Sequence, residues 1–564
     1  MLNREIKKRN ENSLAEAFRF WGVQKGRGKN TLYEKITERM WFINHITHLS
    51  IEERKVILFL LRREDAVLRG ELRECFEKSI ANIDSVIDIL ASRLFVYLRK
   101  DRAFLTDRTD KVYLFSEVRR LLDSFEMLSL HELEKQLSEL ITDRIELSEN
   151  ANPLFRELVM VGGTLPLEVD EIGAGYSHGP VSYRKEMVRL YKDGLVDVVF
   201  VHEDDCFFPV WLLKRRGLNL FEIDQDHACF KQSLYLNTLI RLMDCFFFKM
   251  QEGFLSARMV SECMKRVVQD FGLIKLYQQD LEKLGILIHE GDKFRFMDRL
   301  LFENYERRVK LLEKLLGEDE RAIIKIVKDS RCCTRLYLVS SMMRKVVMAG
   351  FLATRQGKVI LKDEMMRFLD MVEKLLFRGF LVEDFNSKMV AYNSFQITEP
   401  PPNSLVVNPD LEIIVFGGKY PFHSFYVLAG FSRLLSMNEL IRFKVDRSTL
   451  WQGMAYIGDV DVLIKLLEKA SKYPLSDAVV SLLRGWAAGF VRLEIQRRWL
   501  VKVESNDAKL KLFQNRWIRS NVEEAGKLNL ILREGVDINR FMKEIRKESV
   551  YVEITGNDDK PQIL

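Results

Sequence analysis

The stretch Leu405-Val406-Val407-Asn408-Pro409-Asp410-Leu411-Glu412-Ile413-Ile414-Val415 decides the fold expected for the last third of the chain. Two short β-rich runs flank the tripeptide Asn-Pro-Asp. Proline fixes its own φ angle, and Asn and Asp side chains close turns by hydrogen bonds to the nearby backbone. The stretch therefore predicts a β-hairpin with Pro409 in its turn.

A further extended run and three helices are predicted after this hairpin. The extended run covers residues 440–445, and each helix begins near a capping residue. Apolar residues of the second helix recur at helical spacing, at Val460, Leu463, Ile464 and Leu467. The predicted helices cover residues 448–456, 459–468 and 476–487.

A second hairpin is predicted to close this region, because apolar and polar residues alternate in 490–495 and 499–503 around a turn at 496–498. Trp486 lies on the same predicted helix face as Leu482 and Leu483. We expect its ring to pack on the closing hairpin. The alternative is an exposed tryptophan that marks a docking surface.

The order of these elements resembles the helicase-associated domain that precedes the motor in XPB-type DNA repair and transcription helicases. The residues that carry the resemblance are the hairpin with Pro409, Ser448 and Leu450 at the start of a helix, Gly458 before the next, and Trp486. One departure is the order Pro474-Leu475, where the family has Leu-Pro. The family also includes bacterial proteins without a motor. The resemblance implies an XPB-N-terminal-like α/β domain that contacts DNA or docks a helicase or another repair or transcription protein.

The bulk composition predicts a folded chain of several domains. At 564 residues it should form about three to five compact units. It has 47% hydrophobic residues, 30% charged residues and only 11 prolines, which argues against long disordered linkers. The net charge of +6 permits nucleic-acid binding without requiring it.

The cysteines and the hydropathy pattern predict a cytoplasmic protein, associated with the nucleoid if it binds DNA. The seven cysteines are odd in number and form no Cys-x-x-Cys pair, which is typical of free thiols in a reducing compartment. Residues 337–353 form the longest apolar candidate, and Arg344 and Lys345 interrupt it. We expect no membrane association, no disulfide and no zinc site.

Residues 1–45 resemble a SAP-like DNA-binding motif, in which two short helices flank a basic, glycine-rich turn. The matching residues are Leu14, Phe18, Gly22-Val23, Lys29, Leu32 and Ile36. Lys25, Arg27 and Lys29 in the turn are candidates for phosphate contacts, because cations neutralise phosphates and release counterions. The alternative is an ordinary helical hairpin with a solvated turn. Asn30 after Lys29 excludes a Walker-type phosphate loop.

An order of helices followed by a hairpin recurs four times and is typical of winged-helix modules. In the first module, helices at 51–62, 68–76 and 83–92 precede strands at 94–98 and 103–106. In the other three, the last helix covers 181–192, 277–284 or 364–377, and the hairpin turns at 204–205, 291–292 or 386–387. Gly194, Gly285 and Gly379 stand where a helix C-terminus needs a left-handed residue.

Only one of these last helices suits DNA, since the last helix of such modules can enter the major groove. It carries Arg184, Lys185, Arg189 and Lys192 against Glu186. The helices at 83–92 and 364–377 are acidic or balanced, which favours packing or protein docking. We take Arg184, Lys185 and Arg189 as candidate DNA contacts, with a solvated basic face as the alternative.

The predicted fold is α+β and mainly helical, with an array of winged-helix-like modules followed by the XPB-like domain. Glu399-Pro400-Pro401-Pro402-Asn403 is the clearest linker. The parts are a SAP-like motif at 1–45, modules at 46–125, 151–230 and 231–302, a connector at 126–150, a connector and module at 303–399, the XPB-like domain at 404–505 and a small α/β extension at 506–564.

No catalytic constellation is evident. His45 and His48 lack a Glu or Cys partner for a metal, and Glu203-Asp204-Asp205 is typical of a solvated turn. Walker and DEAD-type boxes are also missing. We therefore expect a non-enzymatic accessory protein in DNA repair or transcription, without ATPase motor, cofactor, metal or small-molecule substrate. The alternatives are a protein-interaction scaffold with no DNA contact and an enzyme of unrecognised type.

Overall fold

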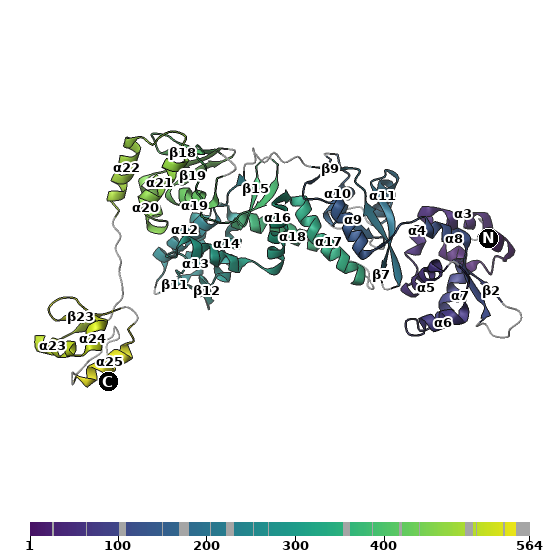
Figure 1. The fold of residues 1–564 in the computed structure, drawn as a ribbon, viewed down its shortest axis with the longest axis horizontal. Coiled ribbons are helices and arrows are strands. Elements are labelled where there is room, and N and C mark those ends of the chain that lie inside the picture. Colours follow the sequence, from purple (N-terminus) through teal and green to yellow (C-terminus); the bar gives the residue numbers. More distant parts are fainter. Residues whose placement is uncertain are drawn as a thin grey trace. The chain divides into compact units, whose positions relative to one another are not determined.

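The computed structural model describes residues 1–24, 28–63, 65–100, 109–148, 150–167, 180–203, 205–220, 230–251, 253–268, 270–353, 361–385, 387–416, 420–438, 440–490, 500–503, 505–533 and 536–548. The fold is α+β, with many short helices and several small sheets (Figure 1). The chain divides into two compact units, Met1–Ala487 and Ala488–Leu564, and each is described by itself.

The first unit begins with four short helices, α1 (Leu2–Lys8), α2 (Ala15–Phe20), α3 (Lys29–Thr37) and α4 (Arg39–Ile46). They lead into an arrangement that we call repeat 1. Its elements in chain order are α5 (Ile51–Arg62), β1 (Val67–Leu68), α6 (Arg69–Phe76), α7 (Ile83–Ser92), β2 (Val96–Arg99) and β3 (Lys111–Leu114). The three strands form an antiparallel sheet in the order β1-β3-β2.

The same order of elements and strands occurs in repeat 3 and repeat 4. Repeat 3 contains α12 (Tyr235–Lys249), β11 (Phe254–Ser256), α13 (Ala257–Val267), α14 (Ile274–Lys283), β12 (Leu287–Glu290) and β13 (Lys293–Phe296). Repeat 4 contains α16 (Glu318–Ser330), β14 (Cys332–Thr334), α17 (Arg335–Ala353), α18 (Leu361–Arg378), β15 (Leu381–Asp384) and β16 (Met389–Tyr392). The sequence predicts that this last module begins at Tyr337. The first helix of repeat 4, α16, lies before that residue. In repeat 4, β10 (Phe230–Lys231) adds a strand to the sheet edge.

Repeat 2 has the same strand order with one helix fewer among its described residues. It consists of α10 (Pro153–Met160), β6 (Thr164–Pro166), α11 (Pro180–Lys192), β7 (Val196–Glu203) and β8 (Cys206–Leu213). Its sheet is extended by β4 (Met127–Ser129), which pairs with β7 in parallel. The neighbouring connections are α8 (Ser116–Asp123), α9 (Leu130–Leu140), β5 (Ile145–Leu147), β9 (Leu218–Leu220), α15 (Tyr305–Leu312) and two short 3₁₀ turns, Phe271–Leu273 and Glu313–Leu315.

The last helix of each of these four repeats ends in the same backbone cap. A residue with positive φ follows the helix, and the next N–H bonds to the carbonyl oxygen five residues back, the pattern that satisfies the free carbonyls of a helix end. These residues are Leu94, Gly194, Gly285 and Gly379, with φ of 67°, 70°, 69° and 82°. The bonds run from Phe95, Leu195, Ile286 and Phe380 at 2.9–3.0 Å. The predicted glycine caps are thus confirmed.

The described partner of β2 in repeat 1 is β3, and the predicted partner lies outside the described residues. Residues 94–98 were expected to pair with 103–106, but β2 pairs with β3, with Val96 opposite Leu114. Residues 101–108 lie outside the described residues. Val112 and Leu114 are buried on the core side of β3, and this burial fixes the register. The runs 103–106 and 111–114 both contain apolar residues and both lie close to β2 in the sequence. Their hydrophobic pattern alone therefore does not show which run pairs with β2.

The sheet at the C-terminal end of the first unit confirms the opening hairpin. β17 (Leu405–Val407) and β18 (Glu412–Phe416) pair with Leu405 opposite Val415, and Pro409 lies in the turn. The strand order is β17-β18-β20-β19, with β19 (Arg433–Met437) and β20 (Leu440–Lys444). The three predicted helices are present as α20 (Arg447–Tyr456), α21 (Val460–Ala470) and α22 (Asp477–Ala488). We call residues 405–488 the sheet–helix domain.

Sequence analysis missed α19 (Phe422–Phe431) and β19. Every residue of α19 except His423 is buried. A helix that is buried on all sides has no polar face and hence no helical periodicity in its hydrophobic pattern. α19 was therefore not predicted, because the periodicity of apolar residues is the signal that indicates a helix in a sequence.

The first strand of the predicted closing hairpin, 490–495, lies outside the described residues except for Phe490. Residues 491–499 lie outside the described residues, and β21 (Leu500–Lys502) pairs with β23 (Asn529–Leu532) of the second unit. The boundary after the sheet–helix domain thus falls near residue 488 rather than 505. Trp486 is half-buried against the core of the first unit, together with the fully buried Leu483, whereas Leu482 is 40% exposed.

The sheet of the second unit has the same strand order as the repeats of the first unit. After β21 come α23 (Asn506–Gln514), α24 (Arg516–Asn521), β22 (Val522–Glu524), β23 and α25 (Ile538–Lys547). The sheet order β21-β23-β22 places the third strand between the first two, as in repeats 1, 3 and 4. We call this arrangement repeat 5. The sequence predicts a helix at 508–515, a strand at 527–532 and a helix at 537–546, and these are present as α23, β23 and α25. It does not predict α24 or β22, and the strand that it predicts at 550–554 lies outside the described residues.

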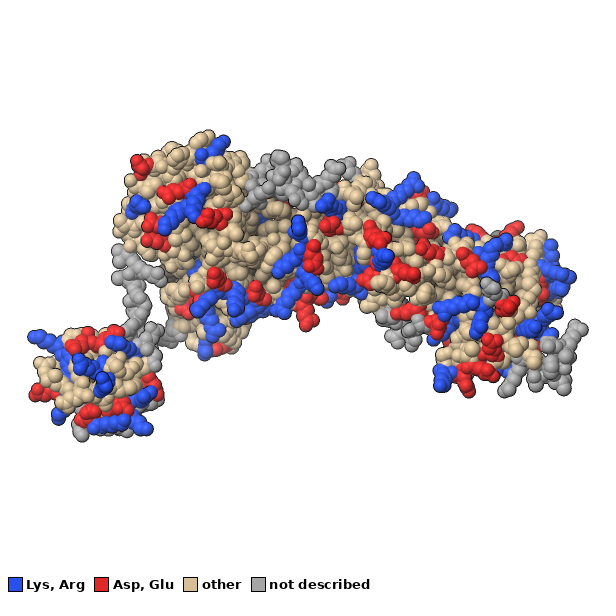
Figure 2. Space-filling model, viewed as in Figure 1, with Lys and Arg blue, Asp and Glu red and all other residues tan. Residues whose placement is uncertain are grey.

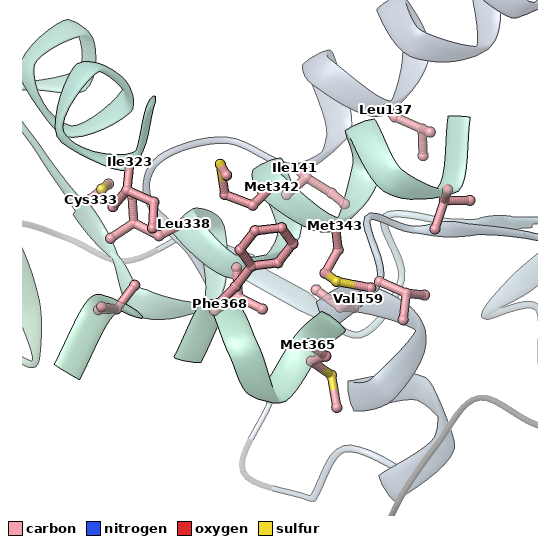
Figure 3. Close-up of a cluster of buried hydrophobic side chains, with 14 of the residues drawn as sticks. Leu137, Ile141, Val159, Ile323, Cys333, Leu338, Met342, Met343, Met365 and Phe368 are labelled. Carbon is pink, nitrogen blue, oxygen red and sulfur yellow. The ribbon is translucent and has the colours of Figure 1, made fainter. Parts of the chain in front are cut away.

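The repeats of the first unit pack on one another through buried contacts. Figure 3 shows side chains of α9 and α10, including Leu137 and Val159, meeting Met342 and Met343 of α17. The Ser340 hydroxyl donates to the Val159 carbonyl, and Gly162 approaches Arg344 so closely that a Cβ there would lie 2.8 Å from the Arg344 Cα. Repeats 2 and 4 therefore form a joint core.

The sheet–helix domain packs directly on repeat 3. Arg241 of α12 donates to the carbonyl oxygens of Ala429 and Ser432 at 3.1 and 3.2 Å. The Asn237 amide donates to the Tyr426 carbonyl, and both residues are buried. The proline-rich stretch before residue 404 is therefore a connection inside one packed unit rather than a linker between independent domains.

Candidate nucleic-acid interface

The predicted basic turn lies between α2 and α3, whose apolar residues form a core. Leu14, Phe18, Leu32 and Ile36 are all buried, which confirms that 14–36 is a packed helical hairpin. Lys25 and Arg27 lie outside the described residues. The remaining candidate, Lys29, forms hydrogen bonds within the protein.

The Lys29 ammonium donates to the carbonyl oxygens of Lys7, at 3.1 Å, and Arg9 at the end of α1. A cation at this position satisfies carbonyls that have no partner within the helix and opposes the helix dipole. A phosphate contact by Lys29 would compete with this capping role.

The predicted basic helix of repeat 2 presents two of its candidates to solvent. Lys185 and Arg189 are exposed on α11, and the side chain of Arg184 lies outside the described residues. Arg189 is 3.5 Å from Glu186 and 4.0 Å from Asp193. Acidic neighbours thus offset part of the charge on this face, and exposed pairs of this kind contribute little stability.

The last helices of repeats 3 and 4 are occupied by packing between the repeats. Asp280 on α14 and Arg378 on α18 are buried and joined at 2.6 Å, and Tyr277 packs on Phe377 edge to face. The buried face of each helix cannot contact DNA, whereas other residues of the two helices, such as Lys275 and Arg367, are exposed.

The last helix of repeat 1 is acidic. Asp84 on α7 accepts hydrogen bonds from Arg69 and Arg73 at 2.6 and 2.8 Å, and Asp88 is 3.1 Å from Arg69. Burial on its own would raise the pKa of the Asp84 carboxyl, but the hydrogen bonds and charges of the two arginines lower it. This helix therefore keeps its negative charge at neutral pH and would be repelled by phosphate.

Repeat 5 has a helix of different character in the same position. α24 has the sequence Arg516-Trp517-Ile518-Arg519-Ser520-Asn521, with two cations and no carboxylate. Arg516 and Arg519 are exposed, and neither forms an ion pair within the described parts of the chain. Ile518 is fully buried and fixes the helix on the core of the second unit.

The neighbouring side chains hold α24 in place, and two of them, Glu544 and Glu548, are carboxylates that offset part of its charge. The Asn515 side chain accepts from the N–H groups of Trp517 and Ile518 at 3.0 and 3.2 Å, as an N-cap does. Its amide nitrogen donates to Glu544 and Glu548 of α25. The guanidinium of Arg540 lies 4.9 Å from the Trp517 ring centre, which adds a third cation to this face.

Arg516 and Arg519 were not predicted as candidates because no helix was predicted at 516–521. Arg540 lies in the helix predicted at 537–546 but was not among the predicted site residues. The signal was available: Asn515 is a strong N-cap residue, and Ile518 and Val522 share a spacing of four. A six-residue helix spans less than two turns, so its hydrophobic period is hard to recognise.

Charge elsewhere on the protein is finely mixed. On the face drawn in Figure 2, Lys and Arg side chains are interspersed with Asp and Glu over both units. The face drawn therefore carries no broad basic patch.

The residues considered for other chemistry have structural roles where they are described. The His45 ring donates through Nδ1 to the Trp41 carbonyl at 2.7 Å, and burial lowers its pKa. Asp205 pairs with Arg62 at 2.9 Å. Within the described ranges, no group of three His, Cys, Asp or Glu side chains could hold a metal ion, and no helix is long and apolar enough to cross a membrane.

Comparisons with known proteins assign no family to the chain. A scan against protein-family models finds no match, and a search of curated proteins finds none either.

Proposed function

We propose that this protein is a non-catalytic, DNA-binding accessory protein built from winged-helix modules. The recurrent order helix, strand, helix, helix, hairpin and the placement of the third strand between the first two support this reading of repeats 1, 3 and 4. Repeats 2 and 5 share the strand order. In such modules the last helix before the hairpin is the element that enters a DNA groove.

The observation that carries the proposal is the contrast between α24 and the equivalent helices. One face of α14 and of α18 is occupied by the buried Asp280–Arg378 contact, and α7 is acidic. α24 is exposed and carries Arg516 and Arg519 with no carboxylate. We assign the principal DNA contact to this helix and a secondary one to Lys185 and Arg189 on α11.

The proposed context is DNA repair or transcription, with a helicase as a candidate partner. The sheet–helix domain has the hairpin, the three later helices and Gly458 in the order of the XPB-type helicase-associated domain. It differs in lacking a closing hairpin within its described residues. This domain would dock the partner, while repeat 5 contacts DNA.

The test is binding of the full chain to a fluorescent duplex of about 25 base pairs over a range of salt concentrations. Each phosphate contact contributes about one unit to the slope of log affinity against log salt. Arg516→Ala with Arg519→Ala should lower the slope by about two units and weaken binding to all sequences. Lys185→Ala with Arg189→Ala should have a smaller effect.

The matched control is Arg258→Ala with Arg307→Ala, which removes the same charge. Both residues are exposed and paired with a glutamate one helical turn away, at 2.9 and 3.1 Å. Equal effects of the α24 variant and this control would mean that only net charge matters and would contradict the assignment to α24.

A scaffold without DNA contact is the second candidate, favoured by the buried Asp280–Arg378 contact between α14 and α18. On that hypothesis the duplex would not bind at about 50 mM salt, where phosphate contacts are strongest. The basic turn is tested in the same assay by replacing Lys25, Arg27 and Lys29 with Ala. We also expect no DNA-stimulated ATP hydrolysis, and hydrolysis that persists through stringent purification would contradict the non-enzymatic assignment.

A further inference from the structure

A groove of about 860 Å³ lies within the first unit, where repeats 3 and 4 meet the sheet–helix domain. Its walls come from the start of α12, from α14, from α18 and from the segment joining α19 to β19. Because these segments are far apart in the sequence, sequence analysis had no means of finding the groove. We propose that it binds a small phosphorylated ligand that also carries a hydroxyl or amino group, such as a nucleotide.

The carboxylates that line the groove are already engaged. Glu373 and Glu383 both bind Arg335, and Asp370 is 2.5 Å from Lys374. Asp270 accepts the Gly272 N–H at 2.8 Å. The lining holds six Lys and Arg side chains against four Asp and Glu side chains, so a net positive charge remains.

Three cations in the lining, Lys231, Arg241 and Lys275, have no ion-pair partner among the described residues, and a fourth, Arg433, lies near enough to Asp446 to help lower the pKa of that carboxyl. Lys231, Lys275 and Arg433 are exposed, and they belong to β10, α14 and β19. Cations that converge from three separate elements on one concave surface favour an anion with several charged oxygens.

Arg241 is the most informative of the four, because it is half-buried. Its Nη2 donates to the carbonyl oxygens of Ala429 and Ser432, which orients the side chain in the groove wall. No carboxylate within the described residues offsets its charge, and desolvation lowers its pKa. A half-buried guanidinium without a counterion gains from an anion placed beside it.

Gln232 provides an independent indication of a ligand. Its side chain is 8% exposed, and its Nε2 donates to the Tyr420 carbonyl at 3.1 Å. Its Oε1 is buried and has no hydrogen-bond partner among the described groups. Native structures seldom leave such an acceptor unpaired. Because the atom is buried, a ligand donor would pair with it only after the Gln232 side chain turns toward the groove.

The size of the groove favours a small molecule over a polymer as its ligand. Pockets for small molecules measure about 300–1,000 Å³, and this groove falls in that range. The proposed ligand thus pairs phosphate oxygens with the cations and a hydroxyl or amino hydrogen with Gln232. The inference does not depend on DNA binding.

The test is calorimetric titration of the full chain with four probes: inorganic phosphate, pyrophosphate, ribose 5-phosphate and ADP. We expect ADP or ribose 5-phosphate to bind, and pyrophosphate to bind more weakly because it lacks the donor for Gln232. Tighter binding of ADP than of ribose 5-phosphate would indicate a nucleotide. The reverse order would indicate a sugar phosphate. Absence of heat with all four at millimolar concentration would overturn the proposal.

Variants locate the binding site. Lys275→Ala with Arg433→Ala changes two exposed residues and should weaken binding at least tenfold without altering the melting temperature. Gln232→Leu should weaken ADP or ribose 5-phosphate more than pyrophosphate. Arg258→Ala, on α13 and outside the groove lining, is the control. Equal affinity of the double variant and this control would place binding elsewhere and reject the assignment.

Discussion

The guanidinium of Arg378 binds the carboxylate of Asp280 at 2.6 Å, and the two side chains are only 5% and 2% exposed. The contact joins the last helices of repeats 3 and 4. Asp280 also accepts from the Tyr235 hydroxyl at 2.7 Å, and Arg378 also reaches Glu320 at 3.1 Å. These partners satisfy the charges that burial removes from water.

Replacing Arg378 by Met should destabilise the first unit by about 3–5 kcal/mol, because Asp280 would remain charged and buried without its partner. Arg367→Met on the same helix is the control. Arg367 is 47% exposed and pairs with Asp319 and Glu364, and such surface pairs contribute about 0–1 kcal/mol. Urea unfolding of the two full-length variants measures the difference, and similar midpoints would contradict the structural role of the pair.

Gly453 lets α20 approach α19 closely. A Cβ at this position would overlap the ring of Phe431, whereas a Cβ at Gly485 on α22 would have no atom within 4 Å. Gly453→Ala should therefore destabilise the unit by about 1–3 kcal/mol, as overpacking does. Gly485→Ala should stabilise it by up to about 1 kcal/mol, because alanine favours the helix. Opposite shifts in melting temperature are the expected result.

His45 should make the stability depend on pH. Burial lowers its pKa below 6.5, and the nearby charges of His48 and Lys35 lower it further, against the hydrogen bond to Trp41. Below pH 6.5 the unfolded chain then binds a proton that the folded chain does not. The stability that neutral His45 contributes is complete above pH 6.5. It is lost as the pH falls from 6.5 toward the pKa of His45 in the folded state.

His45→Gln should therefore flatten the fall in melting temperature between pH 7 and pH 5. His131→Gln, a change at an exposed position on α9, should leave the slope as in the unaltered protein. A slope for His45→Gln equal to that of the unaltered protein would contradict the contribution of His45.

Trp486 is expected to matter for stability, though less than a fully buried ring. It is half-buried, and its carbonyl accepts from Trp451 Nε1 at 2.8 Å. Trp486→Ala should cost about 2 kcal/mol, below the ~3–5 kcal/mol for a fully buried aromatic. Tyr473→Ala, at a side chain 60% exposed, is the control. Normal melting of Trp486→Ala with loss of partner capture would instead mark a docking surface.

Local features of this fold could be predicted from the sequence. The turn at Pro409 and the caps at Gly194, Gly285 and Gly379 depend on residues close together in the chain. Their identities restrict the backbone whatever surrounds them. Amphipathic helices such as α5 and α21 were also predicted within about two residues, since a single buried face imposes a helical period.

The tertiary structure decided what depends on distant partners. β21 pairs with β23 rather than with a neighbouring strand, and α19 shows no periodicity because it is buried on every side. The Arg378–Asp280 pair and the exposed cations of α24 follow from packing between and within repeats. Strand partners and the burial of charge are set by contacts between residues far apart in sequence, and the pattern of a single segment does not contain them.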